Sequence, residues 1–391
     1  MRKSLSLLSL YGLAMVMLLV VWNPMSVVSA AATNNKDNAA ESKIPPHRRH
    51  RQNNVKNKPL TESERLQEYA KRNYTWPLSN YNPNTEGWKR LMDARFAQVA
   101  EIEDSGPRYE GYIQTMHSAF LVPNFTQHGF GLARCPPELL QDLQTAIHEG
   151  LAQNKTRPET KIPVIDAPQQ PRMISRPDLT RRVLHELQIY AETWAQGMPL
   201  TPYMAYGFRL YQNQSQLYMH VDKMQSHIIS FILHIDSSDD AEPWPITIED
   251  FHGQTHQVIL TPGDMLFYES SKCWHGRPQR FHGSWYTSVF VHFYPTNDWY
   301  DRNHNMEAHY AVPPVWSESP SPTKQHRALE MKGTSMMEPD CPNQWCRTMF
   351  AKKWSGPGEE GYVLNPDGSK TVFEPRAKME DAASEEEREE L

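Results

Sequence analysis

The spacing of apolar residues changes near residue 200. Before that point, apolar side chains recur every three to four residues in several segments, which is typical of amphipathic helices. After it, short apolar runs follow one another with turn residues between them, which is typical of strands in a β-sandwich or jelly roll. The expected helices are 61–72, 86–102, 136–151 and 177–194, and the expected strands are 203–212, 215–222, 226–236, 245–250, 256–260, 264–270 and 284–295.

This pattern predicts an α+β protein with a mainly helical N-terminal half and a jelly-roll core. Residues 32–60 are polar and contain few apolar residues, as in disordered linkers. Beyond residue 297 the pattern becomes irregular. The expected division is 1–31 signal peptide or signal anchor, 32–60 basic linker, 61–199 helical region, 200–297 β domain, 298–375 irregular extension and 376–391 acidic tail.

The N-terminus resembles a secretory targeting segment. Arg2 and Lys3 precede the apolar run LSLLSLYGLAMVMLLVVW, and small residues follow it. This order describes a signal peptide, although the run is long enough for an uncleaved membrane anchor. Both alternatives place the rest of the chain in the lumen of the secretory pathway or outside the cell.

The last four residues, Arg388 to Leu391, resemble the K-D-E-L class of retrieval signals. We therefore expect the endoplasmic-reticulum lumen. The alternatives are a secreted protein or one anchored in a membrane of the secretory pathway.

Sequons and cysteines are compatible with that compartment. Four N-x-S/T sequons begin at Asn73, Asn124, Asn154 and Asn213, and the chain has four cysteines. Asn73 and Asn154, near the ends of expected helices, are better glycosylation candidates than Asn213.

Two of the cysteines, Cys341 and Cys346, could close a small disulfide loop, which leaves Cys135 and Cys273 paired or free. Their spacing, with no second pair or histidine nearby, is poor for a zinc site.

Charge excludes one class of partner. The net charge is −6, with a basic stretch before residue 60 and an acidic C-terminus. Such runs are usually solvated tails. No segment between them alternates basic and aromatic residues, so we expect no nucleic-acid partner.

The densest chemical signal is the stretch YMHVDKMQSH, which begins at Tyr218. In a strand, His220 and Asp222 would point to the same face, because side chains two residues apart do so. An imidazole and a carboxylate that converge can bind a divalent metal. His234 and Asp236 form a second such pair, so the motif alone does not decide.

A third ligand follows at His275, which we expect in a loop bounded by glycine and proline. Two histidines and one carboxylate with open coordination positions form the facial triad of non-haem Fe(II) oxygenases. Residues from about 200 to 296 resemble the catalytic domain of the 2-oxoglutarate/Fe(II)-dependent dioxygenases, in the prolyl 4-hydroxylase-like branch. The interval of 55 residues from His220 to His275 agrees with that family.

The resemblance implies a double-stranded β-helix, the jelly roll of this family. It also implies Fe²⁺ bound by His220, Asp222 and His275. The family commonly has a tyrosine nine residues before the first histidine, where it binds 2-oxoglutarate. Tyr211 occupies this position, whereas Gln225 stands nine residues before the decoy His234.

One family position departs from the pattern. Prolyl hydroxylases usually have a lysine ten residues after the second histidine, to pair with the far carboxylate of 2-oxoglutarate, and here that residue is Trp285. We expect Arg277 to take this role because it follows His275 closely, with Arg280 as the fallback. Arg209 and Lys223 are expected to be solvated.

The implied function is a dioxygenase that hydroxylates a substrate in the secretory pathway. The favoured acceptor is peptidyl proline, with dioxygen as cosubstrate and L-ascorbate to maintain the iron. The alternatives are a degenerate jelly roll that serves as a binding or scaffold protein, and an oxygenase that acts on lysine, a small molecule or a glycan. The remaining histidines of the β domain are expected to be ordinary strand or turn residues: His227, His234, His252, His256, His282 and His292.

Overall fold

The computed structural model describes residues 81–100, 105–160, 162, 164–297, 299 and 352–373. All of them belong to one compact unit. The expected signal segment, linker, Cys341–Cys346 pair and acidic tail lie outside the described residues, as does Asn73. None of the helices in the described ranges is long and apolar enough to cross a membrane.

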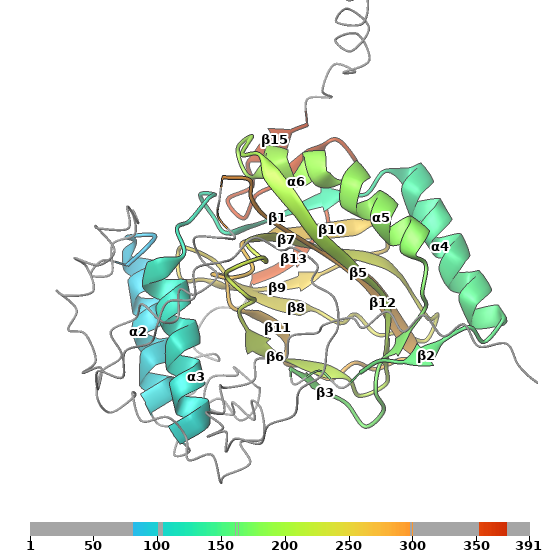
Figure 1. The fold of residues 1–391 in the computed structure, drawn as a ribbon, viewed down its shortest axis with the longest axis horizontal. Coiled ribbons are helices and arrows are strands. Elements are labelled where there is room, and N and C mark those ends of the chain that lie inside the picture. The colour runs from blue at the N-terminus through green and yellow to red at the C-terminus, as the bar shows by residue number, and fades with distance from the viewer. Residues whose placement is uncertain are drawn as a thin grey trace, which may run out of the picture. The chain divides into compact units, whose positions relative to one another are not determined.

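Two β-sheets form the centre of this unit (Figure 1). The larger has nine strands in the order β15-β14-β1-β10-β7-β12-β5-β4-β2, and the smaller has six in the order β13-β9-β8-β11-β6-β3. Paired strands are antiparallel except β13 and β9, which are parallel. The bounds in the larger sheet are β1 Phe130–Arg134, β2 Arg157–Pro158, β4 Arg172–Met173, β5 Leu200–Gln212, β7 Ile229–Ser237, β10 Asp264–Tyr268, β12 Trp285–Pro295, β14 Tyr362–Leu364 and β15 Lys370–Val372; those in the smaller are β3 Ile165–Asp166, β6 Gln216–His220, β8 Ile246–Glu249, β9 Thr255–Ile259, β11 His275–Arg277 and β13 Lys352–Ser355.

The eight consecutive strands β5 to β12 wind between the two sheets. The order β10-β7-β12-β5 in the larger sheet stands opposite β9-β8-β11-β6 in the smaller. This arrangement is the double-stranded β-helix, so the jelly-roll prediction for residues 200–297 is confirmed at the level of the core.

Strand β7 shows how the sequence builds two packing layers. Successive side chains point to opposite faces of a strand. Phe231, Leu233 and Ile235 join the cluster that contains the helices α4 (Pro137–Ala152), α5 (Pro177–Glu186) and α6 (Gln188–Trp194). Ser230, Ile232 and His234 therefore face the lumen between the sheets.

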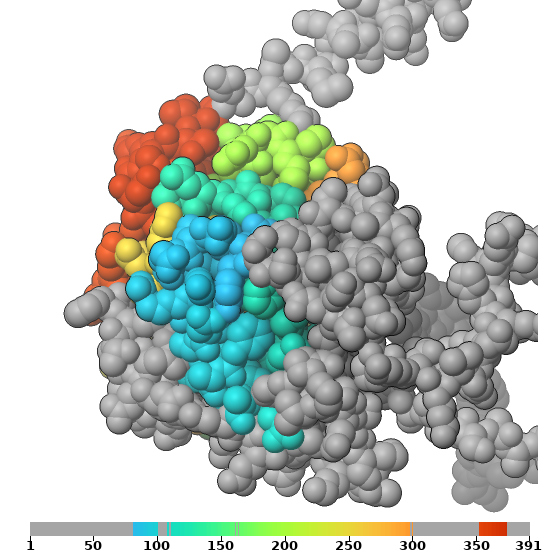
Figure 2. Space-filling view, turned by 90° about the vertical axis from the view of Figure 1, so that its left-hand side faces the viewer, coloured from blue at the N-terminus to red at the C-terminus, as the bar shows by residue number. Residues whose placement is uncertain are grey.

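One of the remaining helices packs against strand β8 of the smaller sheet. The helices α2 (Glu86–Ala100) and α3 (Ser105–Met116) lie side by side, followed by the π-helical turn η1 (His117–Leu121). The buried Arg95 of α2 forms an ion pair with Glu249 of β8, and its guanidinium lies 4.3 Å from the centroid of the Trp274 ring. Figure 2 shows the face that α2 forms (blue), with residues 352–373 (red) along its upper edge.

Three sequence predictions need correction. The region before residue 200 contributes strands β1 to β4 as well as helices, and β1 pairs with β10 in the larger sheet. The helix expected at 177–194 is divided at Leu187 into α5 and α6.

The third correction concerns His275, which lies on a strand and not in a loop, because β11 pairs with both β6 and β8.

Candidate metal centre

The neighbouring strands β6 and β11 bring His220 and His275 together. The two residues are direct cross-strand partners, and their ring centroids are 4.4 Å apart. Asp222 follows β6 in a loop, where its backbone N–H donates to the Ser270 carbonyl over 2.8 Å. Its carboxylate oxygens lie 3.7 Å from His220 Nε2 and 3.9 Å from His275 Nε2. One ligand atom from each residue lies within 4.8 Å of the others, so the His-Asp-His triad is present.

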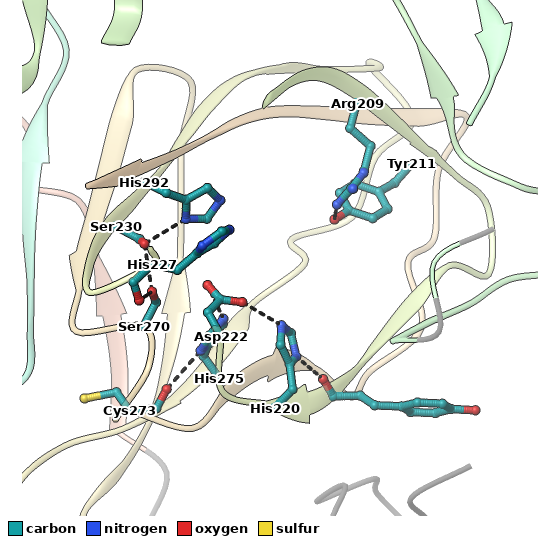
Figure 3. Close-up of polar contacts among 11 residues, drawn as sticks. Arg209, Tyr211, His220, Asp222, His227, Ser230, Ser270, Cys273, His275 and His292 are labelled. Atoms are coloured by element: carbon teal, nitrogen blue, oxygen red, sulfur yellow. Dashed lines mark hydrogen bonds and ion pairs between the residues drawn. The ribbon is translucent and has the colours of Figure 1, made fainter. Parts of the chain in front are cut away.

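Backbone carbonyls orient both imidazoles. His220 Nδ1 lies 2.7 Å from the Tyr218 carbonyl oxygen, and His275 Nδ1 lies 2.9 Å from that of Cys273 (Figure 3). Because a carbonyl oxygen only accepts, each Nδ1 must carry the proton and donate it. The unprotonated Nε2 atoms then face the carboxylate, which is how metal-binding histidines are commonly held.

The charges also suit a cation. Burial alone would raise the pKa of Asp222, but His275, His227, His292 and His220 outweigh it and lower that pKa to about 2. Burial, and then His220, lower the pKa of His275 to about 4. At neutral pH the site therefore presents a carboxylate and a neutral His275, the forms that bind a metal. These residues fit a divalent ion with nitrogen and oxygen ligands.

The second H-x-D pair does not form such a group. His234 Nδ1 donates to the Thr287 carbonyl over 3.0 Å, and its ring stacks on Tyr286 at 4.0 Å. Asp236 instead contacts His148 Nε2 at 2.7 Å. The two side chains therefore have separate partners.

Arg277 lies two residues beyond His275 on β11, so its side chain points into the same lumen. It is 3% exposed, between the rings of Trp244 and Tyr286, with centroids 4.4 and 4.7 Å from its guanidinium carbon. It donates to the Trp244 carbonyl and, over 3.1 Å, to the Tyr286 hydroxyl. Within the described ranges no carboxylate forms an ion pair with it, which is costly for a buried charge.

Further polar groups surround the space between Arg277 and the triad. Tyr211 is buried and pairs across β5 and β12 with Tyr286. Burial, followed by Asp222 and Tyr211, raises the pKa of Tyr268 on β10 well above its usual value, while Arg277 lowers it. The Ser288 hydroxyl is buried, and it has no hydrogen-bond partner among the described residues. Because buried polar groups normally have partners, these groups fit a bound anion.

Arg209 overturns the expectation that it is solvated. It is buried, and it donates to both carboxylate oxygens of Glu159 over 2.8 and 2.7 Å. A third hydrogen bond of 3.1 Å reaches the Tyr211 hydroxyl. Its charge is therefore neutralised within the chain, unlike that of Arg277. By contrast, Arg280 is exposed and bonds Asp166.

The sequence did not predict that two further histidines lie beside the triad. His227 and His292 were expected to be ordinary strand or turn residues, but their rings lie next to Asp222 (Figure 3). Alternation along β12 could have indicated His292, which lies an even number of residues beyond the inward-facing Tyr286.

The sequon asparagines and the cysteines in the described ranges differ in exposure. Asn124, Asn154 and Asn213 are exposed, which leaves each asparagine side chain accessible. Cys135 and Cys273 are both buried and free.

No family model matches the sequence, and no curated protein is similar to it in sequence. Similar solved structures include a Pseudomonas putida prolyl-4-hydroxylase, with TM-score 0.34, 15% identity, and coverage of 44% of this chain and 95% of that one. The core is similar in structure to 2-oxoglutarate/Fe(II) oxygenases.

Two more solved structures are similar to the core. HygX from Streptomyces hygroscopicus, solved with nickel and 2-oxoglutarate, has TM-score 0.31 and 11% identity over 43% of this chain and 83% of its own. An oxidoreductase of the 2OG-Fe(II) oxygenase family from Burkholderia pseudomallei has TM-score 0.28 and 10% identity over 41% and 93%.

Proposed function

We propose that the protein is an Fe(II)- and 2-oxoglutarate-dependent hydroxylase. The observation that carries this proposal is the position of Arg277, a buried cation without a carboxylate partner in the described ranges, two residues from the triad histidine His275. A metal centre with an anion site at this spacing suits a cosubstrate that binds the metal at one end and carries a carboxylate at the other.

Each residue has a defined task in this proposal. His220, Asp222 and His275 hold the iron. Arg277 pairs with the far carboxylate of 2-oxoglutarate, where its planar guanidinium can donate two parallel hydrogen bonds. When bound, iron and 2-oxoglutarate supply the oxidation: substrate C–H, 2-oxoglutarate and dioxygen give C–OH, succinate and carbon dioxide.

For the acceptor we propose peptidyl proline, with ascorbate to keep the iron reduced. The support is the sequence resemblance to the prolyl 4-hydroxylase-like branch. Succinate release by the purified protein, with and without proline peptides, separates this acceptor from the alternatives. Release that only a lysine peptide, a glycan or a small molecule stimulates would identify a different acceptor, and no release would favour a scaffold.

The metal assignment is tested by removing one histidine from each H-x-D pair. We expect His220→Ala to weaken iron binding at least 10- to 100-fold, because a lost ligand matters at least as much as a lost supporting contact. His234→Ala should bind iron normally, since His234 contacts Thr287 and Tyr286 instead. Iron titration of both variants measures this. Iron lost in His234→Ala and kept in His220→Ala would overturn the assignment.

We further propose that the protein resides in the endoplasmic-reticulum lumen and carries N-linked glycans. The support is the N-terminal apolar segment, the Arg388–Leu391 ending and the exposure of the sequon asparagines Asn124 and Asn154. Glycosidase treatment should increase gel mobility, and deletion of the last four residues should increase secretion. Unchanged mobility would contradict glycosylation, and unchanged secretion would contradict retrieval.

A further inference from the structure

A row of rings connects the surface with the metal centre. Tyr203 is 44% exposed, and its ring centroid lies 5.5 Å from that of His227. The His227 ring in turn lies 3.9 Å from that of His292, and both imidazoles lie on one side of Asp222 (Figure 3). The row therefore ends beside a triad residue.

This row and Arg277 lie at opposite ends of the space between the two sheets. Tyr286, which contacts Arg277, and His292 both lie on β12, where their cross-strand partners are Ser237 and Ser230 of β7. Six residues of strand span about 20 Å. A cosubstrate held by Arg277 therefore leaves the His292 end of the lumen for the acceptor.

Hydrogen bonds determine which nitrogen of His292 is protonated. The single hydroxyl proton of Ser270 is donated to the His227 carbonyl over 2.8 Å. Ser230, whose Oγ lies 2.7 Å from Ser270 Oγ, must then donate to Ser270. His292 Nδ1 lies 2.8 Å from Ser230 Oγ and must donate to it. His292 Nε2 is left with a lone pair, so it is an acceptor.

This acceptor has no partner of its own. His292 is 7% exposed, and among the described residues no hydrogen bond reaches its Nε2. Nε2 is not one of the polar atoms that are fully buried without a partner, so it reaches open space where a ligand can contact it. A donor on that ligand would form a hydrogen bond that the chain does not supply. Nε2 is thus prepared for an N–H or O–H group of a bound molecule.

We propose that His292 Nε2 accepts a hydrogen bond from a backbone N–H of a peptide substrate, next to the residue to be oxidised. This inference rests on the proposed function and adds to it the feature that the site recognises. Proline has no backbone N–H, so the donor belongs to a neighbouring residue. Tyr203 and His227 line the approach, and Ser230 and Ser270 are positioning residues that keep the lone pair on Nε2.

The test compares two proline peptides of equal length, one with this backbone N–H and one N-methylated there. The iron- and 2-oxoglutarate-loaded wild type should prefer the N–H peptide about 10- to 100-fold in stimulated succinate release, since the methylated peptide leaves Nε2 unpaired. His292→Phe should lose the preference. His292→Gln should regain part of it, because its side-chain carbonyl also accepts.

Two controls separate recognition from folding. His282→Phe, at an exposed histidine, should keep the preference. Nitrogen NMR of the zinc-substituted protein should show His292 protonated at Nδ1, and this proton should become mixed between the two nitrogens in Ser230→Ala. If His292 and Ser230 only supported the fold, neither the peptide preference nor the position of the His292 proton would change in this way.

The possible outcomes are distinguishable. A proton on Nε2, equal use of both peptides, stimulation by neither, or an unchanged preference in His292→Phe would each overturn the inference. The proposed oxygenase would still stand if the wild type formed the visible charge-transfer band of an Fe(II)–2-oxoglutarate complex. A wild type without that band would overturn the proposed function, and the inference with it.

Discussion

Two buried cations flank the triad residue His275, and they are held in different ways. Lys272, three residues before it, donates to the backbone carbonyls of Asn82, Ser118 and Val122. Arg277, two residues after it, donates to one carbonyl and one hydroxyl. The ammonium of a lysine has three N–H donors and the guanidinium of an arginine has five. Lys272 is therefore fully bonded, whereas Arg277 retains donors for a ligand.

The surroundings of Lys272 indicate that its charge stabilises the fold. Its Nζ lies 5.3 Å from the centroid of the Trp88 ring. Burial raises the pKa of Glu269 and lowers that of Lys272, and the attraction between their charges opposes both shifts. Glu269 accepts from the backbone N–H groups of Phe125 and Thr126. The two charges thus fasten the loop before His275 to residues far away in sequence.

The comparison teaches how to separate structural from functional charges at this centre. Both side chains are almost completely buried, so burial alone does not distinguish them. The number of unused donors does, because a fully bonded cation has nothing left to offer a ligand. By this criterion Arg209, bonded to Glu159 and Tyr211, belongs with Lys272.

The largest expected effect follows from removing the Lys272 charge. Lys272→Met should lower the free energy of unfolding by about 3–5 kcal/mol, because Glu269 loses its opposite charge and three carbonyls lose their donor. Urea denaturation measures this loss. Iron binding should also weaken, since the loop carries His275.

Lys155→Met is the matched control, because Lys155 is exposed beyond α4. Its free energy of unfolding should change by less than about 0.5 kcal/mol. If Lys272→Met unfolded at the same urea concentration as this control, the structural role of the buried charge would be wrong.

The sequence predicted the regular parts of the centre well. Strands β5 to β10 and β12 have long apolar runs or alternation, and the lumen-facing positions follow from that alternation. His220 and Asp222 are close in sequence, so their convergence could be predicted from spacing alone. The strand β11 was missed because its three residues, His275–Arg277, are too few to show a pattern.

The roles of the buried charges could not be predicted from local sequence. Arg209 bonds Glu159, which is 50 residues away in sequence, and Lys272 bonds the Ser118 carbonyl, which is 154 residues away. Periodicity does not predict such pairings, which is why Arg209 was expected to be solvated. The prediction for Arg277 rested on a family resemblance in which an arginine closely follows the second histidine, and the structure keeps Arg277 and His275 on one strand.

A smaller effect, confined to ligand binding, is expected at the other cation. Arg277→Met should raise the 2-oxoglutarate requirement roughly 100-fold, because removing one partner of a buried charge pair costs about 2–5 kcal/mol. Iron binding should persist, since the triad is intact. Anaerobic titration with 2-oxoglutarate, followed by the charge-transfer band, measures the affinity directly.

The outcome of that titration decides between two arginines and sharpens the contrast with Lys272. Arg280→Met is the control, because Arg280 is exposed and bonds Asp166 and the Gln214 carbonyl. It should bind 2-oxoglutarate as the wild type does. Near-normal affinity for 2-oxoglutarate in Arg277→Met would contradict the assignment of Arg277 as the partner of the far carboxylate. A loss of affinity confined to Arg280→Met would instead assign that role to Arg280. A loss of stability in Arg277→Met as large as that in Lys272→Met would show that both cations are structural, because a charge with unused donors should affect the ligand more than the fold.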